Sequence, residues 1–190
     1  MNRKEELQKT TNNVQALDEL RDDVARRQKS GLPFIMASVI IWTLISIVCS
    51  LNIKLSGRNF LVFCCSCPLM PLAMLAAKIL KVNIFGKENP LGKLGFLFTM
   101  NQMIYLLIVM WAFSASPQKM VMIYAMVFGA HLLPYSWLYK EKAYLISAIL
   151  LPVGALVLEY FVSTQVMAIA FAVYEILFSL ILYRNTKKTS

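Results

Sequence analysis

FGAHLLPYSWLYKEKAYL, from Phe128 to Leu145, holds the end of one apolar run, a three-residue charged segment and the start of the next run. A connection this short makes two consecutive helices antiparallel neighbours. The stretch also contains the only histidine of the chain, His131, and a proline three residues later, Pro134. A polar side chain and a helix-breaking residue inside an apolar hairpin are typical of a helix bundle embedded in a membrane.

The apolar residues of the whole chain are gathered into six such runs. Of the 190 residues, 58% are hydrophobic and the mean hydropathy is +0.62, whereas globular domains have about 45–50% apolar residues. Each run is close to the ~20 residues that cross a hydrocarbon core as a helix. We therefore expect an all-α integral membrane protein with six transmembrane helices in one compact bundle. The expected spans are about 33–53, 59–80, 94–114, 119–139, 143–161 and 164–183, within a domain of residues 32–184.

The ends of the chain are polar. Residues 1–31 form a leader in which we expect a short amphipathic helix from about Val14 to Lys29, and residues 185–190 form a basic tail. The leader and the longest internal loop, residues 81–93, are the candidate contact surfaces for a protein partner.

The formal charge of +9 reports membrane topology rather than nucleic-acid binding. All but three of the 19 lysines and arginines, namely Lys54, Arg58 and Lys119, lie in segments that share one side of a six-span topology. The positive-inside rule places that side, with both termini, in the cytoplasm. Aromatic residues near the span ends are expected at the lipid headgroups: Trp137, Tyr139, Tyr144, Tyr160 and Tyr183.

A few polar residues fall inside the apolar runs at one depth. Glu175, His131, Asn101 and Gln102 each lie seven or eight residues from the cytoplasmic end of a span, or roughly 12 Å at ~1.5 Å per residue. A His–Glu pair would offset much of the desolvation that each group suffers alone. Two tyrosines fall near this layer, Tyr105 and Tyr135.

Prolines bring backbone acceptors toward the same layer. Pro134 frees the carbonyl of Ala130, beside His131, and Pro68 and Pro71 are expected to bend the second span. Together these groups indicate either an aromatic-lined binding pocket or polar contacts that only hold helices together.

Cysteines provide the other candidate constellation. Cys64 and Cys67 have the C-x-x-C spacing of a redox dithiol, and Cys49 is expected at a similar depth in the first span. Buried free cysteines also serve as small apolar residues. No metal-binding, triad or phosphate-loop motif is present, so neither a metal nor a cofactor is expected.

At Phe128–Leu145, and at KENPLG (Lys87 to Gly92), the chain resembles a group of small bacterial membrane proteins catalogued only as a domain of unknown function. The resemblance covers about Gly31 to Tyr183 and implies a multi-pass protein of the bacterial cytoplasmic membrane. It implies no catalytic residues.

Three classes of function remain open from the sequence. The first is binding and transport of a small solute through the polar layer, linked to protons by His131 and Glu175. The second is a non-catalytic accessory, immunity or regulatory protein that uses the leader or the 81–93 loop. The third is a membrane enzyme, either a thiol oxidoreductase at Cys64 and Cys67 or a lipid-modifying enzyme at His131.

Overall fold

The computed structural model describes residues 3–86 and 88–188, and it confirms the all-helical bundle with six helices long and apolar enough to span a membrane. The leader forms α1 (Arg3–Arg27) and η1 (Lys29–Gly31). Four spans are α2 (Leu32–Ser50), α5 (Gly92–Ala115), α8 (Lys142–Phe161) and α9 (Thr164–Lys188). The second span consists of α3 (Leu55–Cys64) and α4 (Leu69–Leu80), and the fourth of η2 (Pro117–Lys119), α6 (Met120–Ala130) and α7 (Leu133–Leu138).

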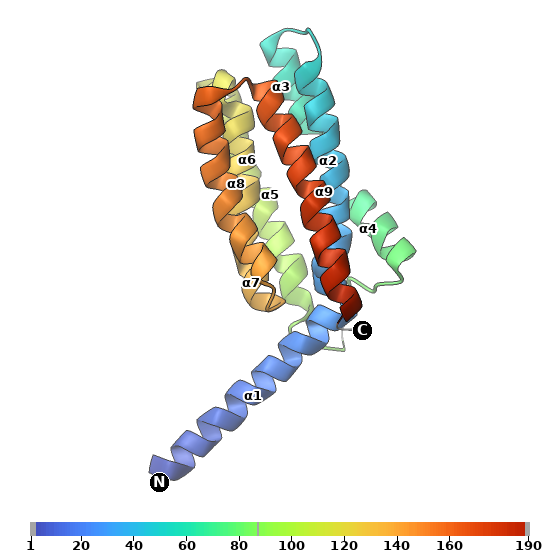
Figure 1. Cartoon of the computed structure of the whole chain (residues 1–190), viewed down its shortest axis with the longest axis vertical. Coiled ribbons are helices and arrows are strands. Elements are labelled where there is room, and N and C mark those ends of the chain that lie inside the picture. The colour runs from blue at the N-terminus through green and yellow to red at the C-terminus, as the bar shows by residue number, and fades with distance from the viewer. Residues whose placement is uncertain (1–2, 87, 189–190) are drawn as a thin grey trace.

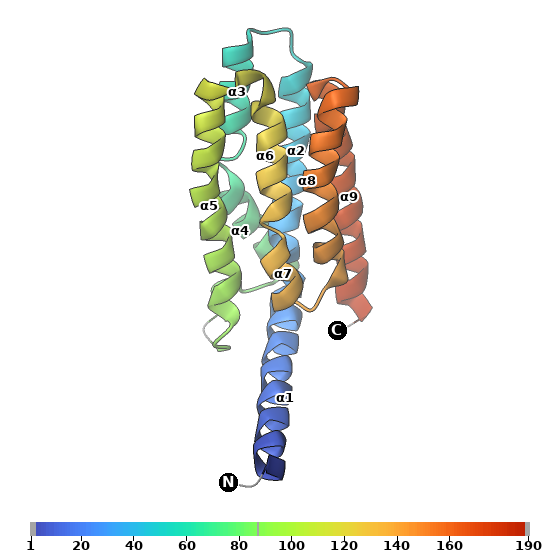
Figure 2. The same ribbon diagram turned by 90° about the vertical axis from the view of Figure 1, so that its left-hand side faces the viewer.

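The spans pack around α2 and α6 (Figures 1 and 2). α2 lies against α9 and α4, while α6 lies against α8 and α5. Trp42 of α2 connects these two groups of helices. The centre of its ring lies 5.5 and 5.6 Å from the ring centres of Tyr124 and Phe128 in α6, and 4.8 Å from that of Phe171 in α9. Both described chain ends lie at one end of the bundle, which we call the terminal end.

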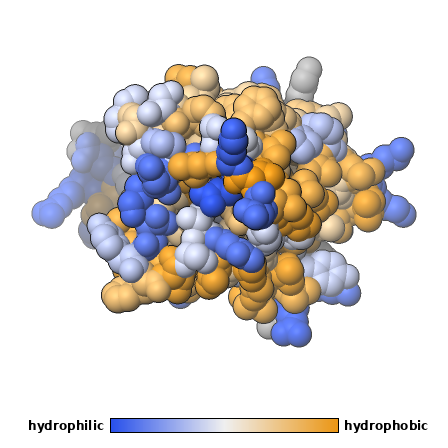
Figure 3. Space-filling view, turned by 90° about the horizontal axis from the view of Figure 1, so that it is seen from above, coloured by the Kyte–Doolittle hydropathy of each residue, from blue (hydrophilic) through white to orange (hydrophobic). Residues whose placement is uncertain are grey.

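Apolar side chains also cover the outside of the bundle. Trp111, Phe161 and Ile79 are between 64 and 80% exposed, and apolar residues surround a hydrophilic end face in Figure 3, which views the end opposite the termini. A surface this apolar is suited to lipid rather than water, so the chain is a multi-pass membrane protein in contact with the bilayer.

The second and fourth spans, which contain Pro68 and Pro134, are broken rather than bent, whereas Pro152 lies inside the unbroken helix α8. The second span unwinds at residues 65–68, and Pro68 precedes α4, which leans away from α3 (Figure 1). Pro71 then lies in the first turn of α4, where its missing N–H breaks no helical bond. The fourth span is interrupted at His131 and Leu132, and Pro134 is in the first turn of α7.

The leader helix is longer than expected. It begins at Arg3 rather than near Val14, because glutamate, lysine, glutamine and leucine are good helix formers and the Gln8 side chain bonds to Asn12 one turn later, at 3.2 Å. Residues 3–17 are exposed and project beyond the bundle. The helix of the last span likewise runs through the start of the expected basic tail to Lys188; residues 189–190 and Lys87 lie outside the described residues.

The second half of the leader packs on α7 and on the 81–93 loop at the terminal end. Arg21 donates to the Trp137 carbonyl at 2.9 Å and lies 4.7 Å over the Trp137 ring. Asn89, in the 81–93 loop, donates to the carboxylate of Asp23 at 2.9 Å. The two surfaces expected to meet a protein partner thus contact each other within the chain.

Candidate functional site

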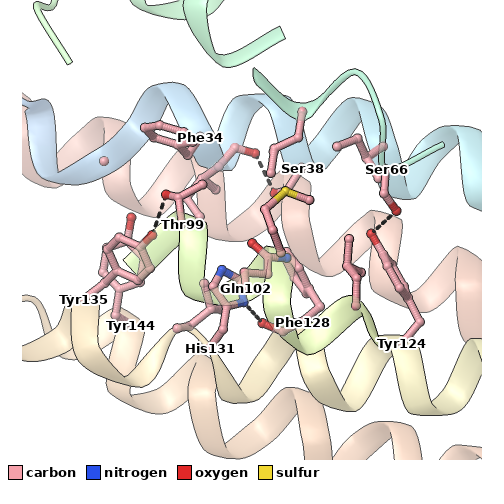
Figure 4. A pocket seen from close by; sticks show the side chains of 17 residues that line it. Phe34, Ser38, Ser66, Thr99, Gln102, Tyr124, Phe128, His131, Tyr135 and Tyr144 are labelled. Carbon is pink, nitrogen blue, oxygen red and sulfur yellow. Dashed lines mark hydrogen bonds between the residues drawn. The ribbon is translucent and has the colours of Figure 1, made fainter. Parts of the chain in front are cut away.

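The two helix breaks face one cavity inside the bundle, which we call the central cavity (Figure 4). It lies between α2, α5, α6 and α7, beside the break of the second span, and its volume is about 40 Å³. This volume holds one or two water-sized molecules, whereas pockets for larger ligands exceed about 300 Å³. The polar lining consists of Ser38, Ser66, Thr99, Gln102, Tyr124, His131, Tyr135 and Tyr144.

His131 owes its position to the break in the fourth span. The amide of Leu132 bonds to the Gly129 carbonyl, one residue nearer than in a regular α-helix, so the Phe128 carbonyl loses its usual partner. The ring Nδ1 of His131 bonds to this carbonyl instead. Because a carbonyl can only accept, Nδ1 carries the proton and Nε2 of the neutral ring keeps a lone pair. His131 thus caps its own helix break and lines the cavity.

Gln102 provides the second polar group of the cavity. Its side chain extends from α5 to a place beside His131 (Figure 4) and is only 7% exposed. None of the described residues hydrogen-bonds to its amide. A buried amide without partners is costly unless water or a ligand satisfies it, so Gln102 offers both a donor and an acceptor to an occupant.

Hydrogen bonds between helices define the two ends of the cavity. Ser66, at the break of the second span, donates to the Tyr124 hydroxyl at 2.8 Å. Toward the terminal end, the Tyr135 hydroxyl pairs with Thr99 at 2.8 Å and donates to the Gly95 carbonyl at 3.1 Å. Each break is therefore anchored to a neighbouring span.

Three stacked tyrosines close the terminal end of the cavity. The rings of Tyr135, Tyr139 and Tyr144 lie 5.6–6.0 Å apart. Tyr139 donates to the Gln28 side chain at 2.9 Å, and Tyr144 donates to the Ser30 carbonyl at 2.7 Å. The prediction that Tyr139 and Tyr144 lie at the headgroups is therefore wrong, because both rings are buried and both hydroxyls bond to the turn between α1 and α2.

Glu175 is fully buried in α9, behind the wall of the cavity. Its Oε2 contacts the Ser38 hydroxyl of α2, and its Oε1 has no partner among the described residues. The ion pair expected between Glu175 and His131 is not formed in this structure, since each residue has another partner. Ser38 lines the cavity and so stands between Glu175 and its interior.

The structure separates the other residues of the expected polar layer. Tyr135 and Gln102 line the cavity, whereas Asn101 is half-buried beside it and Tyr105 is 37% exposed on the outside of α5. A helix turns by about 100° per residue, so Asn101 and Gln102 cannot share one face. The sequence did not single out Ser38, Ser66 and Thr99 as lining residues, although a hydroxyl within an apolar run was a signal that could have found them, and Tyr144 was expected at the headgroups instead.

The cysteines remain thiols at two places outside the cavity lining. Cys64 is half-buried at the end of α3 and Cys67 is exposed within the break of the second span, while Cys49 is buried near the end of α2. Among residues 3–86 and 88–188, no cluster of three or more histidine, cysteine or acidic side chains could hold a metal ion.

Comparison with known proteins gives one match. The sequence model of a family of unknown function (DUF7010) matches residues 17–185, which include every residue of the central cavity. The match begins at residue 17, earlier than the Gly31 expected from the resemblance, and so includes the half of the leader that packs on the bundle. No curated protein and no solved structure matches the chain.

Proposed function

The chain belongs to this family of unknown function, and from its geometry we propose that it binds a small polar solute in the central cavity and moves it across the membrane. The observation that supports the proposal is the meeting of two broken spans at one buried cavity. Solute sites in secondary transporters are formed by discontinuous helices near the middle of the bilayer. Here the breaks at residues 65–68 and 131–132 contribute Ser66 and His131 to one lining.

The chemistry of the lining supports binding rather than helix contact alone. Gln102 is more than nine-tenths buried and has no partner among the described residues, and the tautomer of His131 leaves Nε2 able to accept a hydrogen bond. Side chains that only hold helices together would bond to each other across the interface, as Ser66 and Tyr124 do. A proton link would use Glu175, which Ser38 connects to the cavity.

Membrane orientation completes the proposal. Lysine and arginine are concentrated at the terminal end, so both termini face the cytoplasm of a bacterial cell membrane. The tyrosines close the cavity at its terminal end, and with this orientation they separate it from the cytoplasm. Transport then requires their separation, with a cavity wider than the present 40 Å³ for any solute larger than a few atoms.

A matched pair of variants tests the proposal. Purified wild type, Gln102→Leu and Asn101→Leu are melted with small amines, amides, alcohols and carboxylates, because a ligand that binds only the folded state raises the melting temperature. We expect one class to stabilise wild type and Asn101→Leu but not Gln102→Leu. Uptake of that compound into proteoliposomes then tests movement. Equal stabilisation of both variants would place binding outside the cavity, and binding without uptake would exclude transport.

A second candidate is an accessory protein that contacts a partner through the leader. The observation in its favour is that residues 3–17 form an exposed helix beyond the bundle, with Leu7 and Val14 61 and 55% exposed. Removal of residues 2–16 abolishes partner capture under this function and leaves solute binding intact.

A further inference from the structure

The hydrogen bonds around Ser38 bear on the protonation of Glu175. The Ser38 hydroxyl donates to the carbonyl of Ile35 at 2.8 Å and also contacts Oε2 of Glu175. A hydroxyl has one proton, and a backbone carbonyl can only accept. If Ser38 gives its proton to Ile35, the contact with Glu175 requires a proton on the carboxyl oxygen. A protonated Glu175 satisfies both contacts, whereas a carboxylate leaves one of them without a hydrogen.

Among the described residues, no positively charged side chain pairs with Glu175 from the helices that pack around it. Ser38 contacts it from α2, and the titratable groups that interact with it electrostatically are Tyr144 of α8 and Tyr174 of α9. His131, on the side of α6, bonds to Phe128. None of the described lysines or arginines forms a salt bridge with Glu175. A buried carboxylate without a cation is costly, so an ionised Glu175 needs a cation from outside the chain.

The lining of the cavity suits such a cation. Phe34, Phe128 and Tyr135 present aromatic rings, and none of the described lysines, arginines or acids lines the cavity. Ring faces attract ammonium groups, and His131 Nε2 and the Gln102 oxygen are acceptors for their N–H donors. The volume of about 40 Å³ suits ammonium or methylammonium.

We propose that Glu175 exchanges its proton for a small ammonium-type cation that enters the central cavity beside Ser38. The inference rests on the proposed function and specifies its substrate class. In the exchange, the O–H bond of the Glu175 carboxyl breaks and its proton passes to water as the cation enters. The hydroxyl of Ser38 then turns from Ile35 to donate to the carboxylate, and the N–H groups of the cation donate to the acceptors of the lining. One positive charge replaces another, so the buried site stays neutral overall.

Two further polar atoms at the interface of α2 and α9 bear on the ionised form of Glu175. The indole Nε1 of Trp42 and Oε1 of Glu175 are both buried and have no hydrogen-bond partner among the described residues. Trp42 follows Ser38 by one helical turn, and its ring lies 4.8 Å from that of Phe171, which is one turn before Glu175. A donor and an acceptor that have no partner among the described residues therefore lie on the interface of α2 and α9.

Proton release tests the exchange directly. Full-length protein in nanodiscs, in weakly buffered solution with a pH indicator, is titrated with methylammonium chloride, and sodium chloride is the control salt. We expect saturable release of one proton per wild-type chain and none from Glu175→Gln. Glutamine can still donate to Ser38, so we expect this variant to keep the fold, and its melting temperature checks this. Loss of the protonated-carboxyl infrared band in the variant shows that the band belongs to Glu175.

The outcomes separate this inference from the proposed function. Absence of proton release from wild type, or equal release from Glu175→Gln, overturns the exchange. If an uncharged or anionic compound alone binds in a Gln102-dependent manner, the proposed function stands and the cation is wrong. A wild-type protein without the carboxyl band, under conditions in which no cation is present, contradicts protonation of Glu175 in the closed state.

Discussion

The Tyr144 hydroxyl donates a hydrogen bond of 2.7 Å to the carbonyl of Ser30, and so joins the fifth span to the turn between the leader and the first span. That turn is unusual, because Lys29, Ser30 and Gly31 all have left-handed backbone angles, with φ of 47, 49 and 73°. Left-handed angles are costly for residues other than glycine and persist where neighbouring contacts hold them. The tyrosines that close the cavity thus also hold the leader at a fixed angle to α2.

Tyr144→Phe should destabilise the protein by about 1 kcal/mol, because it leaves the buried Ser30 carbonyl without its donor. The measurement is the thermal or denaturant midpoint in detergent. Tyr160→Phe is the matched control, since Tyr160 belongs to the same helix but is 76% exposed; we expect no change there. Equal midpoints for the two variants would show that the bond to Ser30 contributes nothing.

Gly129→Ala should be destabilising by about 1–3 kcal/mol, since an added methyl group would overpack the contact between α6 and α8. A Cβ at Gly129 would lie 2.5 Å from Cδ of Pro152 and 2.6 Å from Cβ of Leu151. Gly154, also in α8, has open space around it, and Gly154→Ala should be neutral or stabilising by about 0.5–1 kcal/mol. Thermal midpoints of the two variants check the prediction. If Gly154→Ala is the more destabilising of the two, α6 and α8 lie farther apart than in this structure.

The sequence predicts the spans well and their inner contacts poorly, for different physical reasons. Helix length is fixed by bilayer thickness, so apolar runs ended by Ser116–Pro117 or by the charged turn at Lys140–Lys142 correspond closely to α5, α7 and α8. Which side of a span faces inward is not encoded in this way, because lipid and protein interior are both apolar. Asn101 and Gln102 were therefore indistinguishable until packing separated them.

Tyr139 and Tyr144 illustrate the same limit at the span ends. An amphipathic ring near a charged loop suits the headgroup region, but it suits a buried site equally well where a backbone carbonyl accepts its hydroxyl. The acceptor for Tyr144 is Ser30, far away in the chain. The preference of a single residue carries no information about so distant a partner. The pairing of Ser38 with Glu175 was hidden for the same reason.

Acid should weaken the contact between the leader and the 81–93 loop. Hydrogen bonds from Asn89, and then from Arg27 and Arg26, lower the pKa of the Asp23 carboxyl from 3.8 to about 2. A lowered pKa in the folded state means that the stabilisation by Asp23 is complete above about pH 4 and is lost as the pH falls toward 2. We expect the melting difference between wild type and Asp23→Asn to disappear over that range. A difference that stays constant from pH 5 to pH 2 would argue against these bonds.

Truncation of the leader should affect stability only beyond residue 17. Residues 3–16 are exposed and precede the part of the chain that matches the family, so removal of residues 2–16 should leave the melting temperature unchanged. Removal of residues 2–27 also deletes Val24, which is 1% exposed, and the bonds from Arg21 to the Trp137 carbonyl and from Lys140 to Asp22, at 2.9 and 2.8 Å. This longer truncation should lower the melting temperature, because the apolar contact of Val24 is lost and the loop of Asn89 loses its support. If the shorter truncation has the same effect, the first half of the leader has a contact that the single chain does not contain, and a second protein becomes the better explanation for its exposed leucine and valine.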